Sequence, residues 1–211
     1  MKKHFWKIEY SILLFVIFAI MLFLIPSSFY SNEAKYITSW NHAYTKIDYM
    51  FTAMSAQADS EIVKGLKNAK SERKRESLMI RLVEPYLRLY ERDFILSKYR
   101  AHYMNGKRVQ PKDFYYFSKL YMSENNRIVG IKDVSNNKHV SYIFMVMIDV
   151  NGLKGPNTWG KDIYGVNIYK DGKISALGKG KSIEELKNDC SPSGLGVYCS
   201  YYYRIGGDFI E

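Results

Sequence analysis

One loop in the C-terminal half of the sequence gathers oxygen-bearing side chains at close spacing. Within fourteen residues it places Asp149, Asn151, Asn157 and Asp162, with three glycines and a proline between them. Such residues make the backbone fold back on itself. Carboxylate, amide and backbone carbonyl oxygens are the ligands that a hard cation prefers. The loop is therefore a candidate metal site, and calcium is the ion that fits it best.

The loop does not follow the EF-hand pattern. An EF-hand has glycine at its sixth position and a bidentate glutamate at its twelfth. Counted from Asp149, Gly152 stands at the fourth position and Gly160 at the twelfth. The alternative to a metal site is a glycine-rich connection that its own Asp and Asn side chains cap by hydrogen bonds to the backbone. The residues leave both interpretations open.

The second candidate is a pair of cysteines. Cys190 and Cys199 are the only two in the chain and have eight residues between them. In an oxidising compartment, an even and close pair predicts a disulfide rather than a metal site. Closing this loop should stabilise the fold by about 2 to 3 kcal/mol in the chain-entropy model.

Arrangements that could carry catalysis are sparse. Cys199 together with His102, His139 and Arg204 would suggest a cysteine transpeptidase, in which histidine activates a thiolate. A disulfide with Cys190 would remove that nucleophile. The sequence has no phosphate-binding glycine motif, no histidine-rich zinc motif and no serine elbow. We therefore expect no enzymatic activity.

The chain is basic, with 31 Lys and Arg against 21 Asp and Glu and a net charge of +10. The positive charge is densest over residues 64–75 and 170–181. Neither run has the interleaved aromatic residues of a single-strand binder. We interpret both runs as solvated faces and expect no nucleic-acid partner.

The first 58 residues predict one long helix. After a basic leader at residues 1–4, residues 5–26 are apolar enough for a transmembrane helix half. Over residues 27–58 the apolar positions recur every three or four residues, which predicts an amphipathic continuation. Lysines precede the apolar segment, so we expect the N-terminus in the cytoplasm and the remaining chain outside. The expected location is a single pass through the inner (cytoplasmic) membrane, with a periplasmic or extracellular C-terminal domain.

The remaining chain predicts an α+β fold with a small antiparallel sheet. Residues 59–126 are expected to be a helical region, with helices over 59–83 and 85–99, the second beginning at Pro85. Residues 127–211 are expected to form a β-sheet domain that carries the metal loop and the disulfide loop. Its candidate strands cover residues 127–134, 139–150, 163–169, 173–176 and 198–205.

Two signals within this domain are more specific. Asp171 and Gly172 predict a hairpin turn between the third and fourth candidate strands. Residues 140–148 are apolar almost without alternation, so their strand should be central and covered on both faces. The amphipathic half of the long helix is the expected cover on one face.

The N-terminal segment resembles that of type IV pilins and type II secretion pseudopilins. If Phe5 is counted as the first mature residue, Glu9 falls at the fifth position and Pro26 at the twenty-second, and residues 11–25 are all apolar or small. The family has glycine before the cleavage point, where this chain has His4. The resemblance implies a prepilin peptidase that cleaves between His4 and Phe5, methylation of Phe5, and assembly through Phe5, Glu9 and Pro26.

The C-terminal half carries the same resemblance. The loop from Asp149 to Asp162 is similar to an Asp-x-Asn-Gly-x-x-Gly-Pro-Asn loop of pilin-like secretion proteins, and the segment between Cys190 and Cys199 is similar to the C-terminal disulfide loop of pilins. The resemblance implies a pilin-like fold, calcium at Asp149, Asn151 and Asp162, and a structural subunit. Its partners would be other pilin-like subunits or further copies of itself.

Two alternatives remain. Glu9 either meets the free amine of a neighbouring copy, which would set the assembly register, or lies in the cytoplasmic headgroup region beside Lys7. The chain is either an assembling pilin-like subunit or a membrane-anchored exported binding module that never polymerises.

Overall fold

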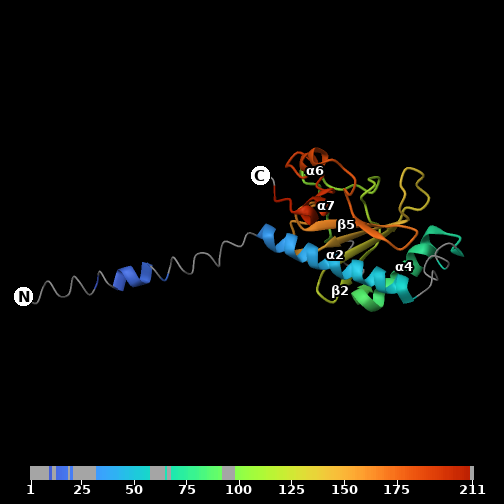
Figure 1. The fold of residues 1–211 in the computed structure, drawn as a ribbon, viewed down its shortest axis with the longest axis horizontal. Coiled ribbons are helices and arrows are strands. Elements are labelled where there is room, and N and C mark those ends of the chain that lie inside the picture. The colour runs from blue at the N-terminus through green and yellow to red at the C-terminus, as the bar shows by residue number, and fades with distance from the viewer. Residues whose placement is uncertain are drawn as a thin grey trace, which may run out of the picture. The chain divides into compact units, whose positions relative to one another are not determined.

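The computed structural model describes residues 32–57, 68–91 and 98–209, together with residues 10, 13–18, 20 and 65. The chain divides into two compact units, residues 1–35 and 36–211. In chain order its elements are α2 (Asn32–Gln57), α4 (Glu72–Leu87), β1 (Leu89–Glu91), β2 (Leu120–Ser123), β3 (Ile128–Asp133), β4 (Phe144–Asp149), η1 (Gly152–Lys154), β5 (Ile163–Ile168), β6 (Ile174–Ala176), α6 (Ile183–Asp189), α7 (Cys199–Tyr202) and η2 (Tyr203–Ile205) (Figure 1).

Helix α2 is the long amphipathic helix that the sequence predicts, and it ends at Gln57. Its buried residues recur every three or four positions: Trp40, Ala43, Ile47, Met50, Phe51 and Met54. The opposite face is solvated, and Tyr49 there is 73% exposed. Burying each large apolar side chain favours the fold by about 1.5 to 3 kcal/mol relative to exposing it. The apolar stripe therefore holds α2 against the core.

The six strands form one antiparallel sheet in the order β1-β2-β3-β4-β5-β6, so each strand pairs with its neighbours in sequence. Strand β4 is central and all six of its residues are buried, which confirms the prediction for the apolar block. The hairpin between β5 and β6 is also confirmed, since the N–H of Gly172 donates to the carbonyl of Tyr169 at 3.0 Å.

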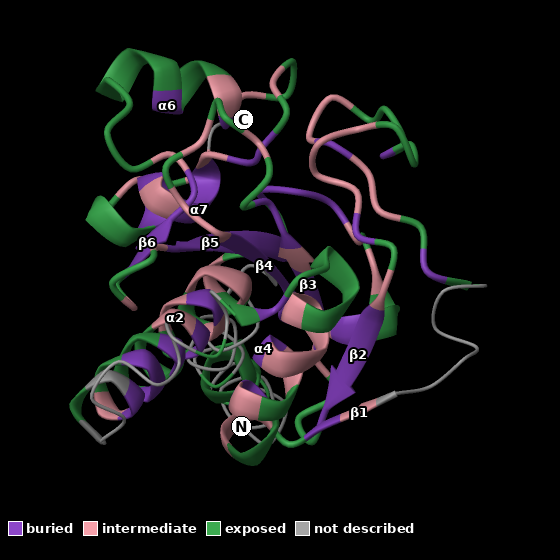
Figure 2. Cartoon of the chain, turned by 90° about the vertical axis from the view of Figure 1, so that its right-hand side faces the viewer, coloured by how far each residue is buried: buried purple, intermediate pink, exposed green. Residues whose placement is uncertain are grey.

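Both faces of the sheet are covered. On one face, Phe144, Val146 and Ile148 of β4 belong to a core that also contains the buried residues of α2 and α4. Figure 2 shows these two helices on the same side of the sheet. On the other face, Met145 and Met147 belong to a core formed with the loop that precedes β2. This alternation places successive side chains in separate cores.

The predicted helical region over 59–126 is wrong where β1 and β2 lie. The predicted helix start at Pro85 is also wrong, because Pro85 lies inside the last turn of α4. The helix ends at the left-handed Arg88, whose N–H donates to the carbonyl of Glu84 at 2.6 Å. Ser71 caps its N-terminus by accepting from the N–H of Lys74.

Where the sequence predicts a last strand over residues 198–205, the structure has α7 and η2. The aromatic residues favour a strand locally, but tertiary packing decides otherwise. The buried positions are Cys199, Ser200, Tyr202 and Tyr203, which is helical rather than alternating spacing. The preceding helix α6 begins with a capping box between Ser182 and Glu185.

In the first unit, residues 13–18 are helical and exposed, from 45% for Ile17 to 73% for Phe15. Among the described residues no helix has both the length and the apolar character needed to cross a bilayer. Most of residues 5–26 lie outside the described residues. The same holds for His4, Phe5, Glu9 and Pro26, on which the predicted processing and assembly depend.

Candidate functional site

The sheet brings the two aspartates of the predicted metal loop together. Asp149 is the last residue of β4, and Asp162 directly precedes β5. Because Asp149 is paired with Ile163 across the two strands, the residues between them form a loop that closes on itself. Both aspartates are fully buried, at 0% exposure.

Asp149 accepts hydrogen bonds at both carboxylate oxygens. Its Oδ1 accepts from the backbone N–H groups of Asn151 at 3.1 Å and Gly152 at 2.8 Å. Its Oδ2 accepts from the hydroxyl of Tyr99 at 2.8 Å. Tyr99 is 50 residues distant in sequence, and no local pattern marks it as a partner of this loop. The contact therefore ties the loop to the chain segment on the second face of the sheet.

Asp162 caps the other half of the loop. Its Oδ2 accepts from the N–H of Asn157 at 2.8 Å, and its Oδ1 accepts from the N–H of Thr158 at 2.6 Å. These are the capping bonds that the alternative interpretation predicts. The peptide bond between Gly155 and Pro156 is cis.

The electrostatics of the pair disfavour two bare negative charges. Burial raises the pKa of Asp149 well above its ordinary value, and the charge of Asp162 raises it further. Burial also raises the pKa of Asp162, against the hydrogen bonds from Thr158 and Asn157. A bound cation would offset the cost of ionising both groups.

Capping leaves two amide oxygens unused. Asn151 donates through Nδ2 to the hydroxyl of Tyr36 at 3.0 Å and to the carbonyl of Gly155 at 2.7 Å. Its Oδ1, like the Oδ1 of Asn157, is buried and has no hydrogen-bond partner among the described residues. Buried polar atoms normally have a partner, so each orphan needs an explanation. Two such oxygens beside two carboxylates fit the donor set of a hard cation.

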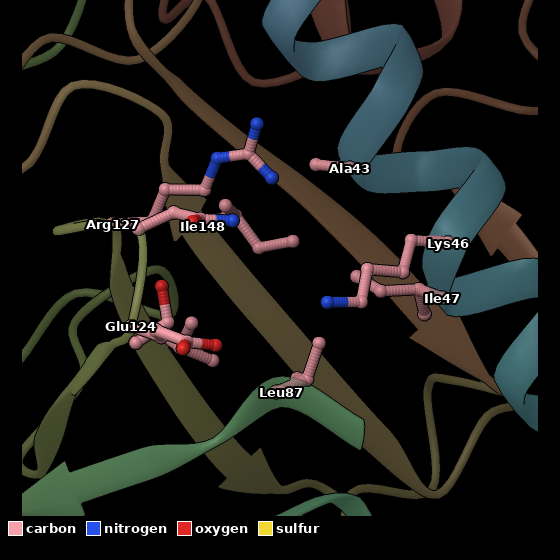
Figure 3. Close-up of a pocket in the computed structure, with 10 residues that line it drawn as sticks. Ala43, Lys46, Ile47, Leu87, Glu124, Arg127 and Ile148 are labelled. Atoms are coloured by element: carbon pink, nitrogen blue, oxygen red, sulfur yellow. The ribbon is translucent and has the colours of Figure 1, made fainter.

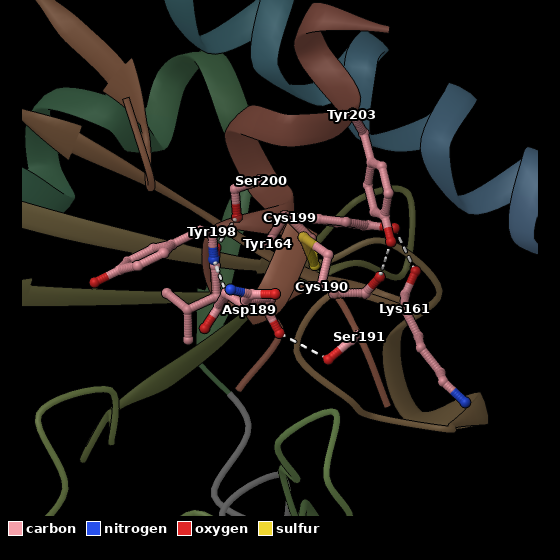
Figure 4. The surroundings of a disulfide bond; sticks show 12 residues. Lys161, Tyr164, Asp189, Cys190, Ser191, Tyr198, Cys199, Ser200 and Tyr203 are labelled. Atoms are coloured by element: carbon pink, nitrogen blue, oxygen red, sulfur yellow. Dashed lines mark hydrogen bonds between the residues drawn. A yellow bond between two sulfur atoms is a disulfide. The ribbon is translucent and has the colours of Figure 1, made fainter. Parts of the chain in front are cut away.

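The predicted disulfide between Cys190 and Cys199 is present, with Cα atoms 5.3 Å apart. It joins the end of α6 to the first residue of α7 (Figure 4). Asp189 stabilises the loop that the disulfide closes through two hydrogen bonds. Its carbonyl accepts from the N–H of Gly196 at 2.8 Å, and its Oδ2 accepts from the N–H of Tyr198 at 2.6 Å. A disulfide of this kind suggests an extracytoplasmic domain.

Asp189 and the two cysteine sulfurs lie within 4.8 Å of one another. Both sulfurs belong to the disulfide, and metal binding by cysteine requires a thiolate. The nucleophile of the transpeptidase interpretation is occupied, because the sulfur of Cys199 belongs to the disulfide. The backbone of His102 forms β-bridges with Arg108 and Thr158, and the guanidinium of Arg204 lies over the ring of Tyr44 at 4.1 Å from its centroid.

The aspartate loop contacts the disulfide loop and the η2 segment that follows it. A Cβ added at Gly160 would lie 2.8 Å from Sγ of Cys199 and 2.8 Å from the carbonyl oxygen of Gly196. The hydroxyl of Tyr203 in η2 donates to the carbonyl of Gly160 in the aspartate loop at 3.0 Å. The hydroxyl of Tyr164 in β5 donates to the carbonyl of Lys161, a short hydrogen bond (Figure 4). These tyrosines were not among the sequence candidates, because aromatic residues are common throughout this chain.

No protein-family model, curated protein or solved structure matches the chain significantly. The architecture itself is pilin-like: a long N-terminal helix packed on a six-stranded antiparallel sheet, with a disulfide near the C-terminus.

Proposed function

We propose that this chain is a pilin-like or pseudopilin-like structural subunit of a type II secretion or type IV pilus system, which assembles through its N-terminal helix and carries out no catalysis. The observation that carries the proposal is the way in which α2 is held. Its apolar face packs on the sheet, and the indole of Trp40 hydrogen-bonds to Ser200 beside the disulfide. A helix fixed in this way can present its N-terminal extension to neighbouring copies.

The exposed apolar residues 13–18 support the same proposal. A continuous apolar surface of this kind needs lipid or other helices as its surroundings. The proposed location is the inner membrane, with the disulfide-bonded domain outside the cytoplasm. The proposed partners are other pilin-like subunits or further copies of the chain, and a prepilin peptidase acting at His4 and Phe5.

The intact mass of the protein isolated from native membranes tests the processing step. Loss of residues 1–4, with or without a methyl group on Phe5, is the expected result. A full-length mass would contradict processing and would favour a permanently anchored protein.

Assembly is tested separately by replacing Glu9. If its carboxylate meets the amine of a neighbouring copy, Glu9→Gln should weaken filament or oligomer formation in membranes. Glu33→Gln is the matched control, because Glu33 is an exposed carboxylate in the first turn of α2. Oligomers that form equally well in both variants would rule out this role for Glu9.

We also propose calcium as a ligand of the aspartate loop, held by Asp149, Asn151, Asn157 and Asp162. The support is the pair of buried, unpartnered amide oxygens beside two buried carboxylates. The full-length protein in detergent should melt at a higher temperature with calcium than with a chelator, because a ligand of the folded state stabilises it. Asp149→Ala should lose this difference and Asp171→Asn should keep it, since Asp171 is an exposed acid outside the loop.

A second candidate function is a membrane-anchored exported binding module. A cavity of about 280 Å³ favours it; Arg100, Arg108 and aromatic residues line this cavity on the face of the sheet opposite α2. Known ligand pockets begin at about this size. A full-length mass combined with a monomeric protein in membranes would favour this function over assembly.

A further inference from the structure

A small cavity lies between α2 and the turn that joins β2 to β3, apart from both loops of the candidate site. It has a volume of about 30 Å³. A water molecule needs about 10 to 15 Å³ of such space, so the cavity has room for two or three oxygen-sized atoms. Its polar lining consists of Lys46 from α2, Ser123 at the end of β2, and Glu124, Asn125 and Arg127 from the turn (Figure 3).

Arg127 is the main positive charge at this cavity. Its side chain is partly buried, and its Nη2 donates to the hydroxyl of Ser39 at 3.0 Å. Among the described residues no carboxylate lies within 4.0 Å of its guanidinium. Burial lowers the pKa of Arg127, and no neighbouring acid opposes that effect. A guanidinium has five N–H donors in a planar fork, so most of its capacity remains for a ligand.

Lys46 and Ser123 complete the lining. Figure 3 shows the amine of Lys46 reaching from α2 into the same space as Arg127. Ser123 is 7% exposed, and its buried Oγ has no hydrogen-bond partner within the described part of the chain. A buried hydroxyl without a partner is unfavourable, so it points to a group that is bound there.

Among the described residues that line the cavity, the one acid does not neutralise these cations. The carboxylate of Glu124 is 2.6 Å from the guanidinium of Arg88, and both side chains are more than half exposed. The cavity is therefore left with the charges of Lys46 and Arg127 and with an unused hydroxyl.

We propose that this cavity binds a single oxyanion, a phosphate, sulfate or carboxylate group, held by the guanidinium of Arg127, the ammonium of Lys46 and the hydroxyl of Ser123. A planar guanidinium matches two oxygens of such a group, and the hydroxyl supplies a third donor. The volume admits only oxygens of such a group and has no room for a nucleoside or a sugar ring. This inference does not depend on the proposed pilin-like function.

The test uses the full-length protein in detergent. Its melting temperature is measured against phosphate and acetate, with chloride maintaining a constant ionic strength. Phosphate also stabilises proteins nonspecifically, so the decisive quantity is the difference between two variants that each lose one positive charge. Arg127→Gln should raise by about tenfold the phosphate concentration that produces a given shift in melting temperature. Lys179→Gln, an exposed lysine outside the cavity, should leave it unchanged.

Two further variants guard against misfolding of Arg127→Gln. Ser123→Ala removes only the hydroxyl, and Lys46→Gln changes an exposed residue of α2. Both should weaken phosphate binding, by about threefold for the lysine. Equal phosphate responses in all four variants would overturn the proposal.

The anion can be free or can belong to a second copy of the chain, and the same samples distinguish the two sources. A shift in melting temperature with phosphate or acetate that is the same at every protein concentration indicates a free anion. If neither anion shifts the wild type, dimerisation that Arg127→Gln abolishes and Lys179→Gln keeps, measured by sedimentation, indicates a carboxylate of another copy. Neither a shift nor such dimerisation would overturn the site.

Discussion

The indole N–H of Trp40 donates a hydrogen bond to the backbone carbonyl of Ser200 at 2.9 Å, across 160 residues of sequence. The same indole ring stacks on Tyr164 of β5 with ring centroids 5.0 Å apart. Ser200 in turn accepts at Oγ from the N–H of Gly165 in β5 at 2.9 Å. One residue of α2 thus joins the long helix, the sheet and the segment that follows the disulfide.

Trp40→Phe should therefore destabilise the protein more than its loss of size suggests. Phenylalanine keeps an aromatic ring but leaves the buried carbonyl of Ser200 without its donor. We expect the free energy of unfolding to fall by about 2 to 3 kcal/mol. Urea unfolding of the full-length protein in detergent measures this free energy. The control is Tyr49→Phe on the exposed face of the same helix, which should change the free energy of unfolding by less than about 0.5 kcal/mol. Similar losses of stability in both variants would contradict the anchoring role of Trp40.

Removing the disulfide should also weaken the fold. The bond spans a sequence separation of 9 and both cysteines are fully buried. Cys190→Ala combined with Cys199→Ala should lower the free energy of unfolding by about 2 to 3 kcal/mol, because the unfolded chain gains entropy. A reductant present during unfolding should destabilise the wild type and leave the double variant unchanged. A reductant effect on the double variant would show that another cause acts, since the chain has no further cysteine.

Asp189 should make stability fall as pH rises. Burial raises its pKa above the ordinary value of 3.8, against the hydrogen bonds it accepts. Between the ordinary pKa of the unfolded chain and the raised pKa of the folded protein, Asp189 holds a proton in the folded state that the unfolded chain has released. The free energy of unfolding therefore decreases as pH rises through this range. Asp189→Asn cannot titrate and keeps an oxygen that can accept from Tyr198. Relative to wild type, the variant should gain stability from about pH 4 upward in urea unfolding.

The exposed Asp208 provides the control for this pH dependence, as Asp208→Asn. Its unfolding should follow the wild-type pH profile. If Asp189→Asn follows that profile as well, the carboxylate of Asp189 does not carry the predicted dependence.

The sequence was most informative where a local period decides the structure. The buried positions of α2 and the apolar run of β4 each reflect packing on a neighbouring layer, so both were predictable. The predictions from the sequence failed where contacts with distant residues determine the secondary structure. Tyr202 and Tyr203 have strand propensity, but the disulfide at Cys199 and the packing against β5 turn their segment into a helix.

In the candidate site, too, local signals were predictable from the sequence and long-range contacts were not. Asp149 and Asp162 could be named from their loop, because the glycines and proline around them are local signals. The hydroxyls of Tyr99 and Tyr36 reach that loop from 50 and 115 residues away. No spacing in the sequence encodes either contact. Likewise, the cavity at Arg127 depends on where α2 crosses the turn between β2 and β3, which is a tertiary property.

The contact between the disulfide loop and the aspartate loop is tested by Gly196→Ala. Gly196 has φ of +79°, and a Cβ there would lie 2.1 Å from the carbonyl oxygen of Trp159. Because the neighbouring atom is backbone, one of the two loops would have to move. We expect the free energy of unfolding to fall by about 3 kcal/mol or more, with the left-handed backbone contributing about 1 to 2 of that.

Gly180→Ala separates the two causes of that loss. Gly180 has φ of +89°, but nothing lies within 4 Å of the added Cβ, so this variant carries the backbone cost alone, about 1 to 2 kcal/mol. The additional loss of stability in Gly196→Ala then measures the free-energy cost of separating the two loops. Equal losses of stability in the two variants would mean that the aspartate loop can move away from the added Cβ without a free-energy cost. The disulfide loop would then not stabilise the aspartate loop. A large excess would also predict weaker calcium binding in Gly196→Ala, because displacing Trp159 shifts the backbone next to the amides that cap Asp162.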